Sequence, residues 1–174
     1  MISEIISKRR NKAVLVEGYI SLLIRIILIT IIGYLIFTQV FIVSRAVGNE
    51  MFPAVKDGDL VIGFRLQQYY EKNDVITYKI DGVSKVGRYI GQGNDVISMD
   101  DTGTLLVNGS VQSGDIMYPT YAREGMENPY RVSADHVFIL GDYRTQAEDS
   151  RDFGAIEMED IEGKVITILR RRGL

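Results

Sequence analysis

The sequence predicts a mostly β body, a barrel or sandwich, attached to the membrane by one N-terminal transmembrane helix. Two patterns point to this fold class. Eighteen consecutive residues from Ile26 to Val43 carry no formal charge ("IILITIIGYLIFTQVFIV"). After Val43 the helical period gives way to short apolar runs separated by turn residues, which is typical of antiparallel β proteins. A chain of 174 residues is long enough for one such domain and an appendage.

The charge-free run is long enough to cross a bilayer. At about 1.5 Å per residue it spans roughly 27 Å, and Tyr19–Ile24 extend it on the N-terminal side. Arg25 lies near that end, where its side chain can reach the interface. A cleaved signal peptide usually has a shorter apolar region, of about 7–15 residues, so we expect an uncleaved anchor. The length and the apolar character of every face also argue against a buried core helix.

Charge is distributed unevenly along the chain. The cluster "KRRNK" (8–12) precedes the apolar run, so the positive-inside rule predicts a cytoplasmic segment 1–18, a transmembrane helix 19–43 and an extracytoplasmic domain 44–174. Residues 45–174 contain fifteen Lys and Arg and twenty-one Asp and Glu, which gives no support for nucleic-acid binding. With no cysteine and one histidine, His136, we expect no disulfide, no metal site and no cofactor.

Seven segments of the body have the composition and alternation of strands. Glycines and the pair Asn108-Gly109 separate several of them in the manner of hairpin turns. Asn108-Gly109-Ser110 also fits a glycosylation sequon, but we interpret it as a turn. Tyr118–Tyr130 is the one long irregular loop that we expect. The predicted strands are Asp59–Leu66, Asp74–Ile80, Ser84–Ile90, Asp95–Asp100, Thr104–Asn108, His136–Asp142 and Gly163–Leu169.

Four sequence blocks follow in order behind the predicted anchor. They are "GNEMFPAVKDGDLVI", "NDVITY", "GRYIGQGNDVI" followed by "LLVNG", and "GDYRTQAEDSRDFG". Together they resemble type I signal peptidases, the membrane-bound Ser/Lys proteases of peptidase family S26. The first two are similar to that family's Gly-x-Ser-Met-x-Pro block and its following strand. The third is similar to Lys-Arg-Val-Ile-Gly-x-Pro-Gly-Asp-x-Ile and Leu-x-Val-Asn-Gly, and the fourth to Gly-Asp-Asn-Arg-x-x-Ser-x-Asp-Ser-Arg-x-x-Gly. The resemblance covers most of residues 19–154 and implies a signal-peptidase-like β fold.

The three reacting positions depart from that pattern. In the family a serine attacks the scissile carbonyl, a neutral lysine takes its proton, and a second serine orients the lysine. By position these roles fall on Glu50, Gly87 and Ala147. A carboxylate attacks an amide poorly, glycine has no side chain to act as a base, and alanine has no hydroxyl. The joint loss predicts a site without peptidase chemistry.

The residues around the reacting positions match the family blocks. Met51 and Pro53 are expected to shape the loop that carries Glu50, and Gly58-Asp59 to form a tight turn into a strand. Four charged residues have a spacing suited to charge-assisted hydrogen bonds, and we expect them to brace the site loop rather than to react. These residues are Asp142, Arg144, Asp149 and Arg151.

Two catalytic alternatives stay open. Lys85 lies two residues before Gly87, so on a strand both point to the same face, about 6.6 Å apart. Lys85 could then act as a substitute base, with Ser44 as the nucleophile; Ser84 would face the opposite side of its strand. A second alternative is an acid pair of Glu50 with Asp142 or Asp149. Under these alternatives the protein is an active membrane-bound type I signal peptidase with an altered site.

With an acidic residue and a glycine at the Ser and Lys positions, the sequence resembles the signal-peptidase-like proteins encoded with the sortase-built pili of streptococci. That resemblance implies an accessory or chaperone role in pilus polymerisation in a Gram-positive cell membrane, with pilin subunits or sortase as partners. We expect an extended peptide to bind the former substrate cleft by strand pairing. The predicted walls of this cleft are the loop with Met51 and Pro53 and the strand with Val75 and Thr77.

Overall fold

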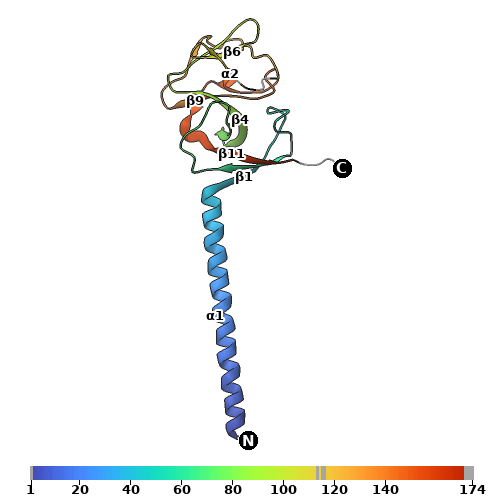
Figure 1. Ribbon diagram of the computed structural model, residues 1–174, viewed down its shortest axis with the longest axis vertical. Helices are drawn as coiled ribbons and strands as arrows, with labels where there is room; N and C mark the ends of the chain where they lie inside the picture. Colours follow the sequence, from blue (N-terminus) through green and yellow to red (C-terminus); the bar gives the residue numbers. More distant parts are fainter. Residues whose placement is uncertain (1, 113, 115–116, 171–174) are drawn as a thin grey trace. The chain divides into compact units, whose positions relative to one another are not determined.

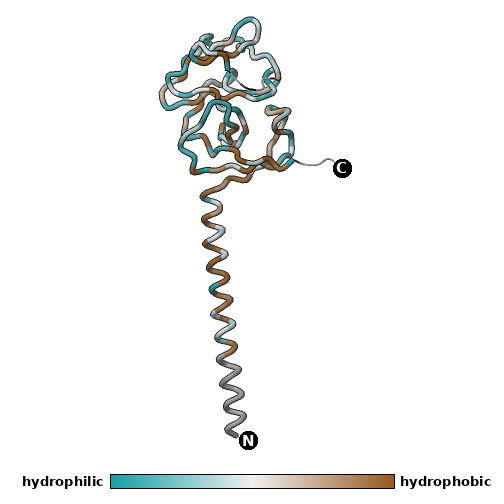
Figure 2. The backbone as a smooth tube through the Cα atoms, viewed as in Figure 1, coloured by the Kyte–Doolittle hydropathy of each residue, from teal (hydrophilic) through white to brown (hydrophobic). Residues whose placement is uncertain are grey.

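The structure, a computed structural model, describes residues 2–112, 114 and 117–170, and describes side chains from Leu15 onward. It divides into two compact units, Met1–Gln39 and Val40–Leu174. The first unit is formed by helix α1 (Ile2–Val40; Figure 1). Its segment Leu15–Val40 has a mean hydropathy of 2.6 and is long and apolar enough to cross a membrane (Figure 2). The basic cluster 8–12, on which the predicted orientation depends, lies outside the residues whose side chains are described.

The second unit consists mainly of antiparallel strands, which confirms the predicted fold class. A seven-stranded sheet and a four-stranded sheet make up most of it (Figure 1). The larger sheet has the order β1 (Phe41–Arg45), β2 (Leu60–Phe64), β11 (Ile161–Leu169), β3 (Val75–Ile80), β4 (Val83–Gln92), β9 (His136–Leu140) and β10 (Ile156–Glu157). The smaller sheet has the order β7 (Ser110–Val111), β6 (Leu105–Val107), β5 (Val96–Met99) and β8 (Tyr130–Arg131). Helix α2 (Ser150–Phe153) and a 3₁₀ turn η1 (Met158–Asp160) complete the elements.

Each of the seven predicted strands is present, with ends shifted by a few residues. Strand β1 was not expected, because its residues continue the apolar run of the helix. The structure ends the helix at Val40, three residues earlier than predicted, because Phe41 to Arg45 pair with β2. Asn108 and Gly109 have φ values of 53° and 76° and connect β6 to β7, so the interpretation of this pair as a hairpin turn is confirmed.

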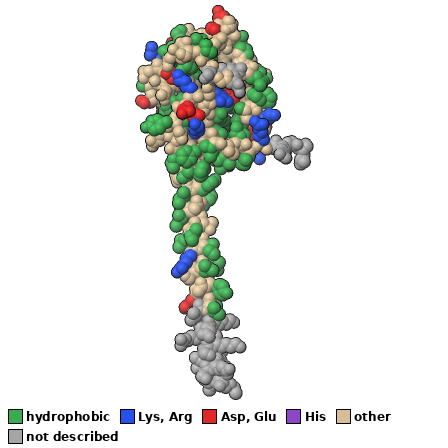
Figure 3. All heavy atoms as spheres, viewed as in Figure 1, with side chains coloured by type: hydrophobic (Ala, Val, Ile, Leu, Met, Phe, Trp, Pro, Cys, Tyr) green, Lys and Arg blue, Asp and Glu red, His purple; other side chains and the backbone are tan. Residues whose placement is uncertain are grey.

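The core of the second unit comprises three hydrophobic clusters that share strand β4. Val86 packs against a first cluster, which is formed by Ala46, Met51, Val55 and Val61. Tyr89 belongs to a second cluster with Ile76, Tyr78, Val137, Ile139 and Ile156. Ile90 belongs to a third cluster with Ile97, Met99, Leu105, Val107, Val132, Phe138 and Leu140. One ten-residue strand therefore links all three clusters. On the face in view, basic and acidic side chains gather on this unit (Figure 3).

Candidate functional site

The loop between β1 and β2 carries Glu50. Gly58 closes the base of this loop with a φ of 82° and donates its N–H to Ala46 O at 2.9 Å. The N–H of Ala46 in turn donates to Asp59 O at 2.8 Å. Met51, the residue after Glu50, is buried in the first hydrophobic cluster. The hydrogen bonds at the base of the loop and the buried side chain of Met51 therefore hold Glu50 in place.

Lys85 is bound between two carboxylates. Its Nζ lies 3.4 Å from Glu50 Oε1 and 2.8 Å from Glu148 Oε2. Burial lowers the pKa of Lys85, but the hydrogen bond to Glu148 and the charges of Glu50 and Glu148 outweigh burial, so the pKa is raised overall. An amine with a raised pKa is protonated at neutral pH. Lys85 therefore has no free electron pair with which to take a proton from a hydroxyl.

The pKa of Glu50 is also raised, but for a different reason. Partial burial of its carboxylate is the largest cause, and the charge and hydrogen bond of Lys85 oppose it. The negative charges of Glu148 and Asp149 add to the increase. The negative charge of Glu50 is therefore compensated mainly by the ammonium of Lys85.

The space beside Gly87 is filled. A Cβ at Gly87 would lie 2.4 Å from Ile139 Cγ2 and 3.0 Å from Tyr78 Cε1, so any side chain there requires its neighbours to move. Tyr78 is 1% exposed. Burial, and then the charge of Glu50, hold the pKa of its phenol well above the usual range. The phenol of Tyr78 is therefore protonated and cannot act as a base in the place of a lysine.

Ala147 is the third position that the family blocks single out. It is buried, and its Cβ would be 2.4 Å from a Cβ added at Gly141. The same added atom would lie 2.6 Å from Glu50 O. A Cβ at Gly87 would lie 3.6 Å from the carbonyl of Leu140, the residue before Gly141. The structure therefore brings Glu50, Gly87 and Ala147, which are far apart in sequence, to one place around residues 140–141.

Glu50 and Lys85 line a cleft of about 220 Å³, called here the Glu50 cleft. One wall is β1 with the loop after it, and the other is the start of β4, Val83 to Val86. Strand β1 is last in its sheet, and β4 pairs with β9 only from Arg88 onward. Among the described residues, the pairings therefore leave a strand edge available on each wall. Such edges can pair with an extended peptide.

The cleft walls differ from those that the sequence predicted. Met51 does line the Glu50 cleft, whereas Pro53 lines a different one. Thr77 is fully buried, and its hydroxyl donates to Gly163 O at 3.3 Å. Val75 packs against the first hydrophobic cluster. Strand β3 lies between β11 and β4, so both of its edges are paired, and the predicted binding role of Val75 and Thr77 is corrected.

The alternative nucleophile and base lie in the same cleft. Ser44, from β1, and Lys85, from β4, both line it. The two carboxylates that hold Lys85 keep its amine protonated, which opposes its use as a base. Ser84 also lines the cleft, and its hydroxyl donates to Glu162 Oε2 at 2.6 Å.

The carboxylates proposed as partners of Glu50 in an acid pair are bound to arginines. Asp142 accepts hydrogen bonds from Nε and Nη2 of Arg88. Asp149 pairs with Arg151 at 2.8 Å. Among the residues that the structure describes, no group of three His, Asp or Glu side chains is placed to hold a metal ion.

Asp149 and Arg151 organise the segment that contains Ala147. Both side chains are almost fully buried, and Asp149 is the N-cap of α2. Asp149 Oδ2 accepts the N–H of Gly141 at 3.0 Å. Arg151 Nη2 donates to the carbonyl of Arg144 at 2.6 Å. These hydrogen bonds join both ends of the segment 141–151 to each other and to Arg144.

Sequence reasoning missed Arg88, Glu148 and Tyr78. Arg88 follows Gly87 directly within the block "GRYIGQGNDVI", and this position could have indicated it. Its Nη1 also donates to Asn73 O at 2.7 Å. Glu148 and Tyr78 had no comparable signal, because their roles depend on contacts with residues distant in sequence.

The chain thus combines an apolar N-terminal helix, long enough to cross a membrane, with a β body that has a cleft between two strand edges. The family described as "Signal peptidase, peptidase S26" matches residues 19–169. The chain therefore belongs to the signal peptidase family S26.

Two curated relatives and a solved structure are similar to this chain. Signal peptidase IB of Staphylococcus aureus (strain Mu50 / ATCC 700699) is 29% identical over 174 residues, with 88% of each chain covered. The thylakoidal processing peptidase 1 of Arabidopsis thaliana is 28% identical over 134 residues, 68% of this chain and 38% of that protein. A crystal structure of a signal peptidase I from Enterococcus faecalis V583 is 26% identical, with a TM-score of 0.48, and covers 57% of this chain and 98% of that one.

Proposed function

We propose that this protein is a non-catalytic member of the signal peptidase family that binds a polypeptide segment in the Glu50 cleft. Its biological role, in this proposal, is that of an accessory or chaperone factor in the polymerisation of sortase-built pili. The observation that carries the proposal is the ion-paired state of Lys85, the amine that lines the cleft beside Glu50.

The chemistry of the three substituted positions supports the loss of hydrolysis. A serine–lysine peptidase needs a hydroxyl beside a neutral amine. By their place in the family blocks, the hydroxyl falls on Glu50 and the amine on Gly87, whose side-chain space Ile139 and Tyr78 fill. The orienting hydroxyl falls on Ala147. None of the three groups present can perform the step expected at its position.

The geometry of the cleft supports peptide binding without catalysis. Strand edges on β1 and β4 can accept backbone hydrogen bonds from an extended chain. The carboxylate of Glu50 repels a carbonyl oxygen, but it accepts an N–H or a lysine ammonium. A lysine-bearing segment of a pilin is therefore the proposed ligand, with sortase as a second partner. The assignment to pili rests on resemblance to streptococcal signal-peptidase-like proteins.

Blocking the cleft tests this proposal. Val47 lines the Glu50 cleft and is 82% exposed, so Val47→Trp can fill the cleft without disturbing the core. Val111 lies on β7, is 64% exposed and lines no part of this cleft, so Val111→Trp is the matched control. We expect cross-linking of pilin and sortase to the full-length protein in detergent to fall for Val47→Trp only. Equal capture by both variants would remove the cleft as the binding surface.

The charge of Glu50 provides a second test of the ligand. Glu50→Gln keeps the shape of the side chain and removes the attraction to an ammonium. We expect this variant to bind a lysine-bearing pilin segment roughly tenfold more weakly, the size of one lost charge-assisted hydrogen bond. A matched segment with norleucine in place of the lysine should bind both forms alike. Equal binding of the lysine-bearing segment by Glu50→Gln and by the unchanged protein would exclude recognition of the ammonium by Glu50.

An active peptidase is the second candidate function. Ser44 and Lys85 line one cleft, and the relatives compared above are named as peptidases. We expect no cleavage of signal peptides by the purified protein in detergent, because Lys85 is protonated. Cleavage that Ser44→Ala or Lys85→Ala abolishes would establish the altered peptidase and exclude the non-catalytic function.

The orientation in the membrane is also part of the proposal. The basic residues at 8–12 favour a cytoplasmic N-terminus, with residues 44–174 outside the membrane. Protease treatment of intact spheroplasts should therefore digest the β body. Protection of the body until the spheroplasts are lysed would require the opposite orientation.

A further inference from the structure

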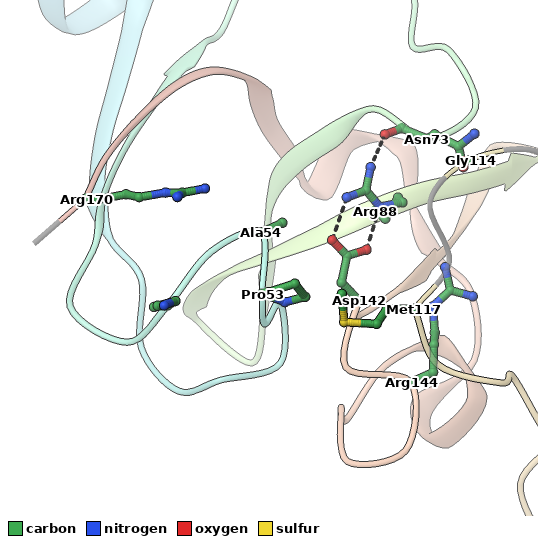
Figure 4. A pocket seen from close by; sticks show the side chains of 10 residues that line it. Pro53, Ala54, Asn73, Arg88, Gly114, Met117, Asp142, Arg144 and Arg170 are labelled. Atoms are coloured by element: carbon green, nitrogen blue, oxygen red, sulfur yellow. Dashed lines mark hydrogen bonds and ion pairs between the residues drawn. The ribbon is translucent and has the colours of Figure 1, made fainter.

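The loop that carries Glu50 also contributes to a second cleft, of about 600 Å³. We call it the cationic cleft, because its charged lining residues are Lys56, Arg88, Arg144, Arg170 and one acid, Asp142. Arg170 lies at one side of it, and Arg88 and Arg144 lie at the other (Figure 4). Pro53, Ala54 and Met117 add apolar surface. The cleft is large enough for several residues of a peptide.

The cations of this cleft are not balanced by the acids that the structure describes around it. Arg88 takes both carboxylate oxygens of Asp142 (Figure 4). Arg151 does the same to Asp149. Asp142 and Asp149, the two carboxylates whose charges act to raise the pKa of Arg144, are therefore each already paired with another arginine.

Arg144 is left with a neutral partner. Its side chain is 2% exposed, and Nη1 donates to the hydroxyl of Thr120 at 2.8 Å. Its Nε has no hydrogen-bond partner among the described residues. Burial lowers the pKa of Arg144 to about 10, so the group is still charged at neutral pH. A buried cation without a counter-ion is costly, and a bound anion would remove much of that cost.

We propose that the cationic cleft binds a carboxylate of an acidic polypeptide segment. Lysine and arginine on two sides of a cleft provide donors for carboxylate oxygens, and the apolar lining fits the rest of a peptide rather than a bare ion. The chain belongs to a family of peptidases, so a polypeptide is also the expected class of ligand. This site shares with the proposed function only a polypeptide ligand, and binding here requires neither pili nor the Glu50 cleft.

Labelled peptides test this site on the full-length protein in detergent. Three fluorescein-labelled decapeptides are compared by anisotropy: one with glutamates and an amidated end, one with glutamines instead, and the glutamine peptide with a free terminal carboxylate. We expect the glutamate peptide to bind roughly tenfold more tightly than the amidated glutamine peptide. Added salt should weaken that binding. Tight binding of the third peptide would identify the chain terminus as a further source of the carboxylate.

Exposed lining residues provide the variants, because substitution of the buried Arg144 would test folding as well as binding. Lys56 and Arg170 are both exposed, so the double variant Lys56→Gln/Arg170→Gln keeps the core intact. It should bind the glutamate peptide roughly tenfold more weakly than the unchanged protein. Lys79→Gln removes an exposed cation of β3 that does not line the cleft and should have no effect. Val47→Trp should also have no effect, which separates this site from the Glu50 cleft.

Two results would overturn the proposal. The first is equal binding of the glutamate peptide and the amidated glutamine peptide, or binding that the double variant does not change. The second is failure of the glutamate peptide while glycerol 3-phosphate binds through Lys56 and Arg170, since the ligand would then be a phosphate.

Discussion

Two ion pairs that include the neighbouring residues Glu148 and Asp149 differ in burial. In the pair of Asp149 and Arg151, called here the buried pair, the side chains are 1% and 2% exposed, and backbone groups satisfy their remaining hydrogen bonds. In the pair of Lys85 and Glu148, called here the exposed pair, the side chains are 21% and 68% exposed. Breaking a buried pair is expensive, whereas an exposed pair contributes little to folding. The buried pair therefore fixes the backbone, while the exposed pair contributes little to stability.

The largest expected effect is on the buried pair. Asp149→Ala leaves Arg151 charged and buried, and it removes the N-cap of α2 together with the acceptor of the Gly141 N–H. We expect the free energy of unfolding to fall by about 3–5 kcal/mol. Urea denaturation of the detergent-solubilised protein measures it. Glu148→Gln is the matched change in the exposed pair and should cost no more than about 1 kcal/mol. Similar losses of unfolding free energy in Asp149→Ala and Glu148→Gln would contradict the expected difference between the two pairs.

The filled space beside Gly87 gives an intermediate effect. Gly87→Ala places a Cβ against Ile139 Cγ2, so we expect a loss of about 1–3 kcal/mol in the free energy of unfolding. Ile139→Leu removes Cγ2 and conserves volume, so it should recover part of that loss when combined with Gly87→Ala. A double-mutant cycle in urea measures the coupling.

Additive effects in that cycle would show that Ile139 is not the obstacle. The same contact bears on any attempt to introduce a lysine at position 87. The side chains of Ile139 and Tyr78 must move to make room for such a lysine.

The smallest expected effect concerns pH. The pKa of Lys85 in the folded protein is raised above the unfolded value of 10.5. Its contribution to stability is therefore present below that value and is lost as pH rises through the folded pKa. Glu148→Gln removes the largest cause of the increase, so the loss should begin at lower pH. ¹⁵N NMR of the Lys85 amine measures the pKa, and an unchanged titration in Glu148→Gln would contradict the assignment.

Most of the fold was predictable, because period-two alternation and turn residues are local signals. The strands β2 to β6, β9 and β11 follow from them. Strand β1 could not be separated from the helix, since Phe41 to Val43 suit both a membrane span and a strand. The register with β2 that decides the matter involves residues about twenty positions away.

The site was predictable only in part. Motif positions indicated Glu50, Gly87 and Ala147, and the structure brings them together. Alternation along β3 could not reveal that both edges of this strand are paired, so Val75 and Thr77 were misplaced. The contacts of Lys85 with Glu50 and Glu148 span 35 and 63 residues, and no local pattern encodes them.

Strand β4 has a consequence for how the β body unfolds. Because Val86, Tyr89 and Ile90 each enter a different hydrophobic cluster, separating this strand from its neighbours disrupts all three clusters at once. Denaturation of the body should therefore be cooperative, with a calorimetric enthalpy equal to the van't Hoff enthalpy. A ligand that binds β4 at the Glu50 cleft or at Arg88 would then protect amides throughout the body from hydrogen exchange.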